Sequence, residues 1–398
     1  MSTKVKLARI STVPYFVVSQ LAGQLDAIVG SDISVTVISS DGPELSMLKS
    51  GALSHRIITV EIARSISFLK DIRALRRLFL IFRQERFDIV HSTNPKAGLI
   101  SAIAGLFAGV PVRLHTFTGQ PWVHMHGPFR SMARWGDCLI GKLNTRCYAD
   151  SESQRRFLVE QRVVLPKQIS VIGAGSIAGV NLERFNMARF TDQARAQTRT
   201  SLGIPPDAPV LLFVGRITVD KGVRELMVAF QQIKKMGSRA HLVFVGPFDT
   251  ERSEGNEITR SAIVDIPDTH IMGYTEQPEV YMAIADILCL PSYREGFGTV
   301  VIEAAAMGVP TVGTDIYGLS DAVVNGETGI LVPPRDPAAL AWALSSLFDD
   351  PVRCGEMGDA AKRRAEMFFD AKQINEKVIA EYHRLVSCVL HDEDGKVT

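Results

Sequence analysis

The sequence has few cysteines, no long apolar run and almost no net charge, and each of these excludes a class of protein. Its five cysteines are scattered over 398 residues without a CxxC pair. They predict reduced thiols, not a disulfide framework or a zinc site. The longest apolar stretch, residues 99–112, is about 14 residues long and contains Gly105, Gly109 and Pro111, so it is too short to span a bilayer.

Charge and composition narrow the choice further. Lys and Arg total 44 against 43 for Asp and Glu, so the basic footprint of a bulk nucleic-acid binder is absent. An apolar content of 46% argues against a disordered chain. The first residues lead into a strand-like run without a signal-peptide pattern, so we expect a cytoplasmic protein that meets a membrane only from its surface.

Short apolar or β-branched runs alternate with helical periods along the whole chain, and the pattern restarts near residue 210. Such alternation predicts parallel sheets with right-handed crossovers, which is an α/β fold formed twice. Between the two blocks, residues 173–179 contain three glycines and no following Lys-Ser/Thr, which favours a linker over a phosphate loop. We expect domains at residues 1–185 and 186–370 and a helix at 371–390 that returns to the first domain.

In open parallel sheets, ligands bind beyond the carboxyl ends of the strands. Several strand-like runs of the second block end in glycine, and the run that ends at Leu290 is followed by a loop that leads to Thr299. Arg216 and Lys221 lie five residues apart across one strand-to-helix turn, so both can reach one anion. The helix that opens at Thr299 adds free N–H groups. Together these groups suit a diphosphate, although the two cations could also be solvated loop charges.

Two glutamates accompany this anion site. Glu303 lies in an otherwise apolar helix, where a carboxylate needs partners such as two ribose hydroxyls, or alternatively a salt bridge or a cap. Glu295 lies eight residues earlier, on the loop before that helix. It could accept hydrogen bonds from sugar hydroxyls or merely balance the helix dipole.

These residues carry a family resemblance. Residues 295–303 (EGFGTVVIE) match the E-x7-E signature of retaining glycosyltransferases of family 4, and the segment from Gly215 to Gly222 resembles that family's diphosphate clamp. Further matches extend over about 120 residues, a span comparable with one domain. The first half is similar, more loosely, to bacterial members that build capsule, O-antigen or lipid-linked glycans.

The resemblance implies a GT-B fold: two Rossmann-like, doubly wound domains with a cleft between them and no metal requirement. It also implies residue roles: Arg216 and Lys221 would hold the donor diphosphate, Glu295 the transferred sugar and Glu303 the ribose. The reaction would keep the anomeric configuration, with the leaving phosphate helping to deprotonate the acceptor. The donor-binding set that we expect is Gly215, Arg216, Lys221, Gly246, Gly273, Tyr274, Glu295, Gly296, Phe297, Gly298, Thr299 and Glu303.

Two departures from the family pattern concern the acceptor. Thr118 stands where many relatives carry a histidine near the reacting sugar, and His115 is the neighbouring catalytic candidate, although a strand-end histidine is more often structural. The first strand-to-helix loop carries Tyr15 and Phe16 in place of a glycine pair. We expect Tyr15, Phe16 and Thr118 to contact the acceptor, although the aromatic loop could instead merely pack against the domain.

Two stretches of the first half combine apolar and basic side chains and could lie on an anionic membrane. One is the helical run 68–83, which could equally be an ordinary core-facing helix. With a lipid-linked acceptor, Lys96 could meet a phosphate. The second stretch comprises Trp122, His124, His126, Phe129, Arg130, Arg134 and Trp135.

The sequence thus predicts a membrane-associating retaining glycosyltransferase that takes a nucleotide diphosphate sugar, expected to be UDP-linked, and needs no cofactor. The expected acceptor is a glycan linked to polyprenyl diphosphate. Two alternatives stay open. One is a UDP-sugar epimerase of the same architecture, which should show more acid–base side chains near the sugar. The other is a catalytically silent nucleotide-sugar-binding partner in a glycan assembly complex.

Overall fold

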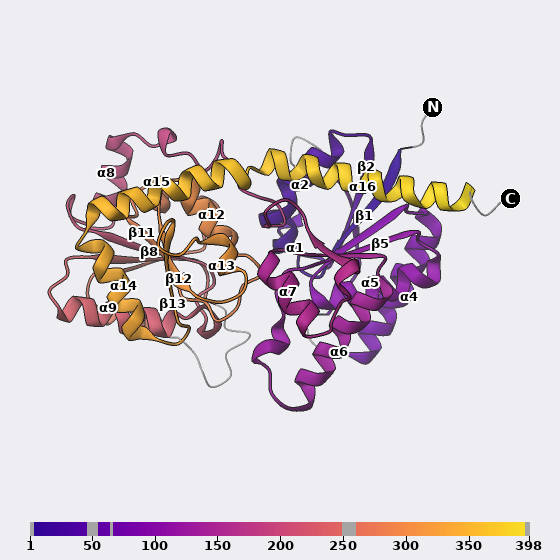
Figure 1. The fold of residues 1–398 in the computed structure, drawn as a ribbon, viewed down its shortest axis with the longest axis horizontal. Coiled ribbons are helices and arrows are strands. Elements are labelled where there is room, and N and C mark those ends of the chain that lie inside the picture. Colours follow the sequence, from indigo (N-terminus) through magenta and orange to yellow (C-terminus); the bar gives the residue numbers. More distant parts are fainter. Residues whose placement is uncertain (1–3, 46–54, 64–66, 249–259, 395–398) are drawn as a thin grey trace. The chain divides into compact units, whose positions relative to one another are not determined.

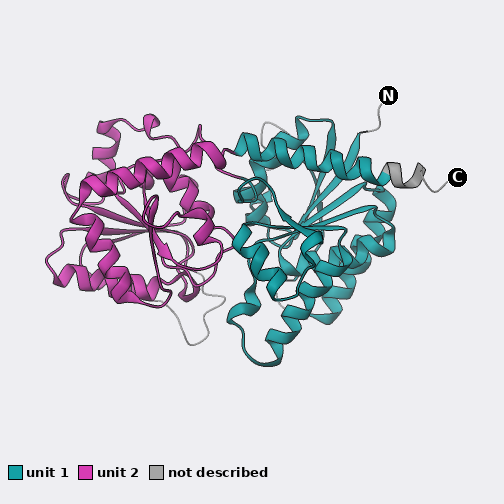
Figure 2. Cartoon of the chain, viewed as in Figure 1, with its two compact units in different colours: residues 1–178, 371–398 teal, residues 179–370 magenta. Residues whose placement is uncertain are grey.

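The computed structural model describes residues 4–45, 55–63, 67–248 and 260–394. The chain divides into two compact units, residues 1–178 with 371–398 (unit 1) and residues 179–370 (unit 2) (Figure 2). The expected boundary at residue 185 therefore falls inside unit 2. The reason is local: Val180 N–H donates to Phe369 O at 2.7 Å, and Phe185 is buried in the core of unit 2.

In the described part of unit 1, seven strands form one parallel sheet in the order β3-β2-β1-β4-β5-β6-β7. The first strand pairs with both β2 and β4, so the chain winds outward from β1 in two directions. The strands are β1 (Val5–Ser11), β2 (Ile33–Ser39), β3 (Arg56–Thr59), β4 (Ile89–Thr93), β5 (Val112–Phe117), β6 (Arg146–Ala149) and β7 (Ile169–Val171).

Both faces of this sheet are covered because successive side chains of a strand point to opposite faces. Leu7 packs toward α2 (Ala22–Val29) and α16 (Ala371–Asp394), whereas Ala8 and Ile10 pack toward α4 (Phe68–Glu85) and α5 (Pro95–Ala108). Figure 1 labels these four helices around the sheet. The remaining helical segments of this unit are α1 (Pro14–Phe16), η1 (Val17–Leu21), η2 (Pro121–His124), α6 (Gly127–Leu143), α7 (Glu152–Glu160) and η3 (Pro166–Gln168).

In the described part of unit 2, six strands form a second parallel sheet in the order β10-β9-β8-β11-β12-β13. The strands are β8 (Val210–Val214), β9 (His241–Val245), β10 (Thr269–Gly273), β11 (Ile287–Leu290), β12 (Thr311–Thr314) and β13 (Gly329–Val332). The helical segments are η4 (Met187–Arg189), α8 (Asp192–Ser201), η5 (Val219–Lys221), α9 (Val223–Lys235), α10 (Arg260–Val264), α11 (Glu279–Met282), α12 (Thr299–Ala306), α13 (Leu319–Ala322), α14 (Pro337–Phe348) and α15 (Pro351–Phe368).

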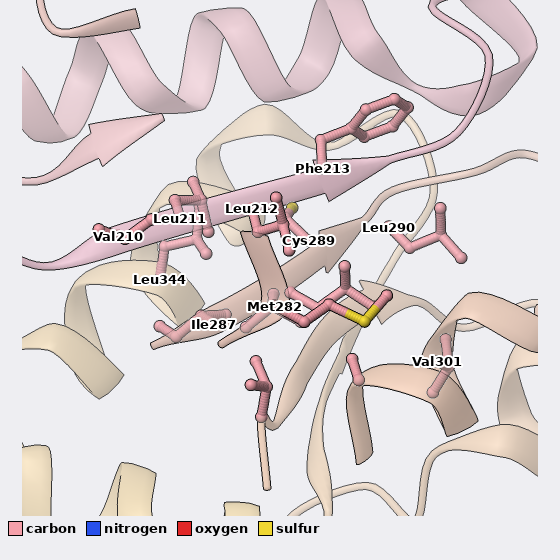
Figure 3. Packing of buried hydrophobic residues seen from close by; sticks show 14 of the residues in the cluster. Val210, Leu211, Leu212, Phe213, Met282, Ile287, Cys289, Leu290, Val301 and Leu344 are labelled. Atoms are coloured by element: carbon pink, nitrogen blue, oxygen red, sulfur yellow. The ribbon is translucent and has the colours of Figure 1, made fainter. Parts of the chain in front are cut away.

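The central strands of unit 2 are apolar without alternation because helices bury both of their faces. Residues 210–213 and 287–290 are almost fully buried. Figure 3 shows part of this core, in which Phe213, Leu290 and Met282 come from three different elements. The repeated α/β pattern predicted from the sequence is therefore confirmed, in two doubly wound parallel sheets.

β6 and α15 are among the elements that were not predicted. β6 has the sequence RCYA, which is short and lacks a β-branched run, so its pattern is hidden after α6. α15 is a largely polar helix of 18 residues. All five cysteines are free thiols.

Candidate functional site

The sheet of unit 2 reverses its winding between β8 and β11, which pair directly. Beyond the carboxyl ends of two such strands, their loops diverge to opposite sides and leave room for a ligand. The loop after β8 carries Arg216 and Lys221, and the loop after β11 carries Glu295. The structure thus brings the predicted donor residues of both loops to one edge of the sheet, which we call the unit 2 rim.

Backbone contacts hold these two loops together. Gly222 has a φ of +69°, and a Cβ there would lie 1.9 Å from Pro291 O, so glycine is required for the close approach. Tyr293 N–H donates to Asp220 O at 2.9 Å. Consequently Lys221 is fixed beside the loop that carries Glu295.

Lys221 and Glu295 form a tight ion pair. The Nζ of Lys221 lies 2.5 Å from Glu295 Oε1, and the two side chains are only 18% and 12% exposed. The hydroxyl of Ser292 donates to the same oxygen at 2.8 Å. The spacing of the sequence does not reveal this contact, because the two partners are 74 residues apart.

Two arginines share a second carboxylate of the rim. Arg216 Nη2 and Arg294 Nη2 lie 3.9 and 3.6 Å from Asp220 Oδ2. Burial tends to raise the pKa of Asp220, but the Thr218 hydroxyl and the neighbouring cations outweigh it and lower that pKa. Asp220 and Arg294 are site residues that were not predicted from the sequence. In the sequence, only their position on the two loops that carry Lys221 and Glu295 indicates that they belong to the site.

The N-terminus of α12 opens onto the same loop. Gly298 precedes the helix with a φ of +86°, and no side chain caps the first turn. Phe297 is buried against Phe369, with ring centroids 5.1 Å apart, so it anchors the loop and leaves only its backbone for a ligand. The first N–H groups of α12 are therefore suited to an anion.

Glu303 lies on α12, half-buried, and burial raises its pKa to about 7. Arg184 opposes this shift and Glu279 adds to it. Arg184 is itself held by Glu279, with Nε and Nη2 at 3.1 and 2.8 Å from the two carboxylate oxygens. Arg184 belongs to the polar segment after the linker, and no sequence signal related it to Glu303.

The other predicted donor residues end the neighbouring strands. Gly215 N–H donates to Val245 O at 2.9 Å, and Gly246 N–H donates to Gly273 O at 2.7 Å, so the three glycines lie side by side. A Cβ on Gly246 would lie 1.9 Å from Gly215 O. Tyr274 follows Gly273 and is half exposed. Gly296 lies between Glu295 and Phe297, with its carbonyl oxygen close to Gly318.

The predicted acceptor residues belong to unit 1. Tyr15 and Phe16 follow β1, Thr118 follows β5, and all three are at least partly exposed. Lys96 is engaged by Asp71 of α4, with Nζ and Oδ1 2.7 Å apart. This pairing ties α4 to α5, so an acceptor phosphate would have to compete with a carboxylate for Lys96.

His115 is completely buried. Its Nδ1 lies 2.9 Å from Ser92 Oγ, and its ring packs edge-to-face on Phe117. Burial lowers its pKa to about 3, so the ring is neutral. Its burial, its contact with Ser92 and its packing on Phe117 favour a structural role, and we do not propose a catalytic role for it.

Both apolar and basic stretches of unit 1 expose large apolar side chains, but Trp122 is not among them. Residues 124–132 are exposed throughout, and Phe129, Met132 and Trp135 project from α6. Phe68, Leu69 and Ile72 project from the start of α4. Trp122 corrects our expectation: it is buried and donates its Nε1–H to Asp137 at 2.7 Å, so it does not belong to this surface.

The described residues contain neither a candidate membrane span nor a candidate metal centre. None of the described helices combines the length and apolar character needed to cross a membrane. Within the same described ranges, no group of three or more His, Cys, Asp and Glu side chains is placed to hold a metal ion.

Comparison with known families gives two matches that together span both units. The model described as "Glycosyl transferase 4-like domain" matches residues 17–175. The model described as "Glycosyl transferases group 1" matches residues 194–364, which include the whole unit 2 rim.

Individual relatives are similar over most of the chain. The capsular polysaccharide biosynthesis glycosyltransferase CapM of Staphylococcus aureus is 29% identical over 380 residues, covering 94% of this chain and 95% of CapM. A D-inositol 3-phosphate glycosyltransferase of Kineococcus radiotolerans is 35% identical over 310 residues, 72% of this chain and 69% of the relative. The UDP-Gal:alpha-D-GlcNAc-diphosphoundecaprenol alpha-1,3-galactosyltransferase of Escherichia coli is 24% identical over 355 residues, 88% of this chain and 89% of the relative.

Among solved structures, HepE of Anabaena in complex with UDP superimposes with a TM-score of 0.77. The match covers 96% of this chain and all of HepE at 18% identity. At that identity the likeness concerns the fold.

Proposed function

The chain belongs to the group 1 glycosyltransferases of family 4 and has their GT-B fold, and we propose that it transfers a sugar from a UDP-sugar with retention and without a metal ion. The observation that carries this proposal is the unit 2 rim. Three cations, from Arg216, Lys221 and Arg294, and the uncapped start of α12 share one edge of the sheet.

The positive charges of the rim suit the diphosphate of the donor. A diphosphate needs several positive groups, and arginine, lysine and helix N–H groups supply them without a metal ion. Arg216 and Lys221 would hold the diphosphate, and the N–H groups of residues 297–299 would complete the cradle. Glu303 would accept hydrogen bonds from the ribose hydroxyls. No described side chain donates a hydrogen bond to this carboxylate, so the ribose would supply the donors. Uridine is our choice of base because HepE, a neighbour of the same fold, binds UDP.

The sugar-facing group would be Glu295. Its carboxylate can accept hydrogen bonds from sugar hydroxyls and stabilise positive charge that develops at the anomeric carbon. In a retaining reaction on one face of the sugar, the leaving phosphate takes the acceptor proton. No separate protein base is then needed, which agrees with the structural character of His115.

The acceptor side would belong to unit 1. We propose a glycan linked to polyprenyl diphosphate, in the assembly of a surface polysaccharide. Two relatives support this by name: CapM acts in capsule biosynthesis, and the Escherichia coli enzyme uses a diphosphoundecaprenol acceptor. The exposed apolar and basic side chains of α4 and α6 would place unit 1 on the inner face of an anionic membrane, where such a lipid resides.

The donor proposal is tested by thermal shift and calorimetry with UDP-, GDP- and ADP-sugars in the presence of EDTA. We expect a UDP-sugar to raise the melting temperature and Lys221→Ala to weaken UDP binding about 10- to 100-fold, the value of one charge-assisted contact. Lys234→Ala is the matched control: Lys234 is 17% exposed and paired with Asp268 at 2.6 Å, away from the rim.

Two outcomes would contradict the proposal. If no activated sugar binds while EDTA is present, the metal-free grip is wrong. If Lys221→Ala and Lys234→Ala have equal, small effects, the diphosphate is wrongly placed. Release of UDP only after addition of an acceptor distinguishes transfer from epimerisation.

A further inference from the structure

The ammonium of Lys221 already holds an anion of the chain itself. Glu295 Oε1 lies 2.5 Å from Lys221 Nζ, and both side chains are largely shielded from water. Such a pair is stronger than an exposed salt bridge, because water and salt screen it less. The proposed function therefore gives two partners to one lysine: the carboxylate that it contacts and the diphosphate that it should bind.

We infer that the Lys221–Glu295 pair is an exchange site: the diphosphate of the donor takes Lys221 from Glu295, and the released carboxylate turns to the transferred sugar. This inference rests on the proposed function and deepens it. It makes Glu295 a competitor of the bare nucleoside diphosphate and a partner of the complete donor.

Charge supports the exchange. The described ion pairs of the two rim loops join three cations (Arg216, Lys221 and Arg294) to two carboxylates (Asp220 and Glu295). A diphosphate that approaches Lys221 meets the negative charge of Glu295 at the same ammonium. Like charges at such distances repel strongly where screening is weaker than in water. Glu295 therefore weakens the binding of UDP by the protein. A UDP-sugar regains this affinity, because its sugar hydroxyls donate hydrogen bonds to Glu295.

Asp220 is different, although it is the second carboxylate of the rim. Its contacts to Arg216 and Arg294 are longer, at 3.9 and 3.6 Å, and Thr218 donates a hydrogen bond to its other oxygen at 2.5 Å. Guanidinium groups have five N–H donors, so both arginines can keep Asp220 and still bind phosphate. Among these three described cations, Lys221 differs because its close partner, the Glu295 carboxylate, is also the group that we propose to bind the transferred sugar.

Ser292 is a positioning residue in this scheme. It is completely buried, and its hydroxyl donates to Glu295 Oε1 at 2.8 Å, the same oxygen that contacts Lys221. When the lysine moves to the diphosphate, this hydrogen bond keeps the carboxylate directed and stabilises its charge. Ser292 therefore acts on the sugar only through Glu295.

The first test is calorimetric titration with UDP of wild type, Glu295→Gln, Glu295→Asp and Glu225→Gln. We expect Glu295→Gln to bind UDP about tenfold tighter than wild type, although it loses transfer activity, because the competing charge is gone. Glu295→Asp keeps the charge but is too short to contact Lys221, so it should also bind UDP more tightly. Glu225→Gln removes one negative charge from α9, where Glu225 accepts from Tyr293 at 2.5 Å, and should match wild type.

Each other outcome has one meaning. Equal or weaker UDP binding by Glu295→Gln overturns the exchange. UDP binding by Glu295→Asp at the wild-type level also overturns it, since charge at a distance then suffices. A wild-type protein that binds none of UDP, GDP and ADP refutes the proposed function itself, so the two failures are distinguishable.

The second test concerns Ser292. The readout is the ratio of the Kd for UDP to the Kd for the UDP-sugar, which measures what the sugar adds to affinity. We expect Ser292→Ala to reduce this ratio about tenfold while the Kd for UDP changes less than twofold, in line with one lost hydrogen bond to a charged group. A merely structural serine would lower the melting temperature and weaken both ligands equally, and that result would overturn its positioning role.

Discussion

At the scale of single residues, the site is defined by carboxylates whose surroundings differ. Glu295 and Asp220 face cations directly, whereas Glu303 is held near Arg184, a cation already engaged by Glu279. Burial thus dominates at Glu303 and raises its pKa to about 7 from an ordinary value of 4.5. The same residue type therefore serves as an ion-pair partner at one position and as a titrating acceptor at another.

The raised pKa of Glu303 predicts pH-dependent donor binding. Ribose hydroxyls donate to the ionised carboxylate, so affinity should fall as pH falls below about 7. If only the ionised form binds, the Kd for UDP rises about tenfold from pH 8 to pH 6. In Glu303→Gln this rise should disappear. Comparison of the two proteins by calorimetry removes the titration of the UDP phosphate, and parallel curves would contradict the role of Glu303.

The free energy of unfolding depends on pH in the opposite direction. Folding raises the pKa of Glu303, so the folded form binds its proton more tightly than the unfolded chain does. The free energy of unfolding therefore receives its full contribution below about pH 4.5 and loses it as pH rises through about 7. Donor binding and stability consequently change in opposite directions with pH.

The site residues show how far a sequence can be interpreted at this scale. Lys221, Glu295 and Glu303 were predicted because charged residues beside strand ends and in an apolar helix are unusual. Their partners were not. Arg184 acts through a contact that the fold creates, with Glu279 across 95 residues, and local spacing contains no information about it. Ser292 lies only three residues before Glu295, but a serine at that distance is not a signal by itself.

At the scale of elements, the loop between β8 and α9 depends on one glycine. Gly222→Ala adds a Cβ that would lie 1.9 Å from Pro291 O at a φ of +69°, so the loop must move away from the end of β11. We expect a loss of about 3 kcal/mol in the free energy of unfolding and at least tenfold weaker UDP binding. Urea unfolding and calorimetry measure both.

Gly237, beyond the other end of α9, provides the control. Its φ is +92°, and a Cβ there would meet no atom within 4 Å. Gly237→Ala should therefore cost only the conformational strain, about 1 kcal/mol, and leave UDP binding unchanged. Equal losses in the two variants would mean that the contact with Pro291 does not position the rim.

Helix α6 allows a test of membrane contact. Trp135 is 63% exposed, in the same stripe as Phe129 and Met132. On our proposal, Trp135→Ser should reduce binding to vesicles containing phosphatidylglycerol about tenfold, since a buried aromatic ring contributes one to two kcal/mol. Trp342 of α14 in unit 2 is 68% exposed and gives the matched Trp342→Ser control. Co-sedimentation at low salt measures binding, and equal losses or no wild-type binding would contradict the proposal.

At the scale of the whole molecule, the repeated α/β pattern was predictable because buried parallel strands read as continuous apolar runs. The order of the strands was not, because pairing of β1 with β4 and of β8 with β11 joins distant segments. The return of the C-terminal helix to the first unit was predicted and is confirmed. The chain after residue 370 belongs to unit 1, where Ile374, Val378 and Tyr382 complete its core.

This connectivity makes unit 2 a continuous segment and therefore testable alone. Residues 179–370 have their own hydrophobic core, and all three cations of the rim belong to them. We expect this fragment to unfold cooperatively and to bind UDP within about threefold of the full chain, without transferase activity, because the proposed acceptor residues lie in unit 1. Circular dichroism and calorimetry measure both properties. A folded fragment that does not bind UDP would show that the donor grip needs residues of unit 1, and an unfolded fragment would show that the core of unit 2 is insufficient by itself.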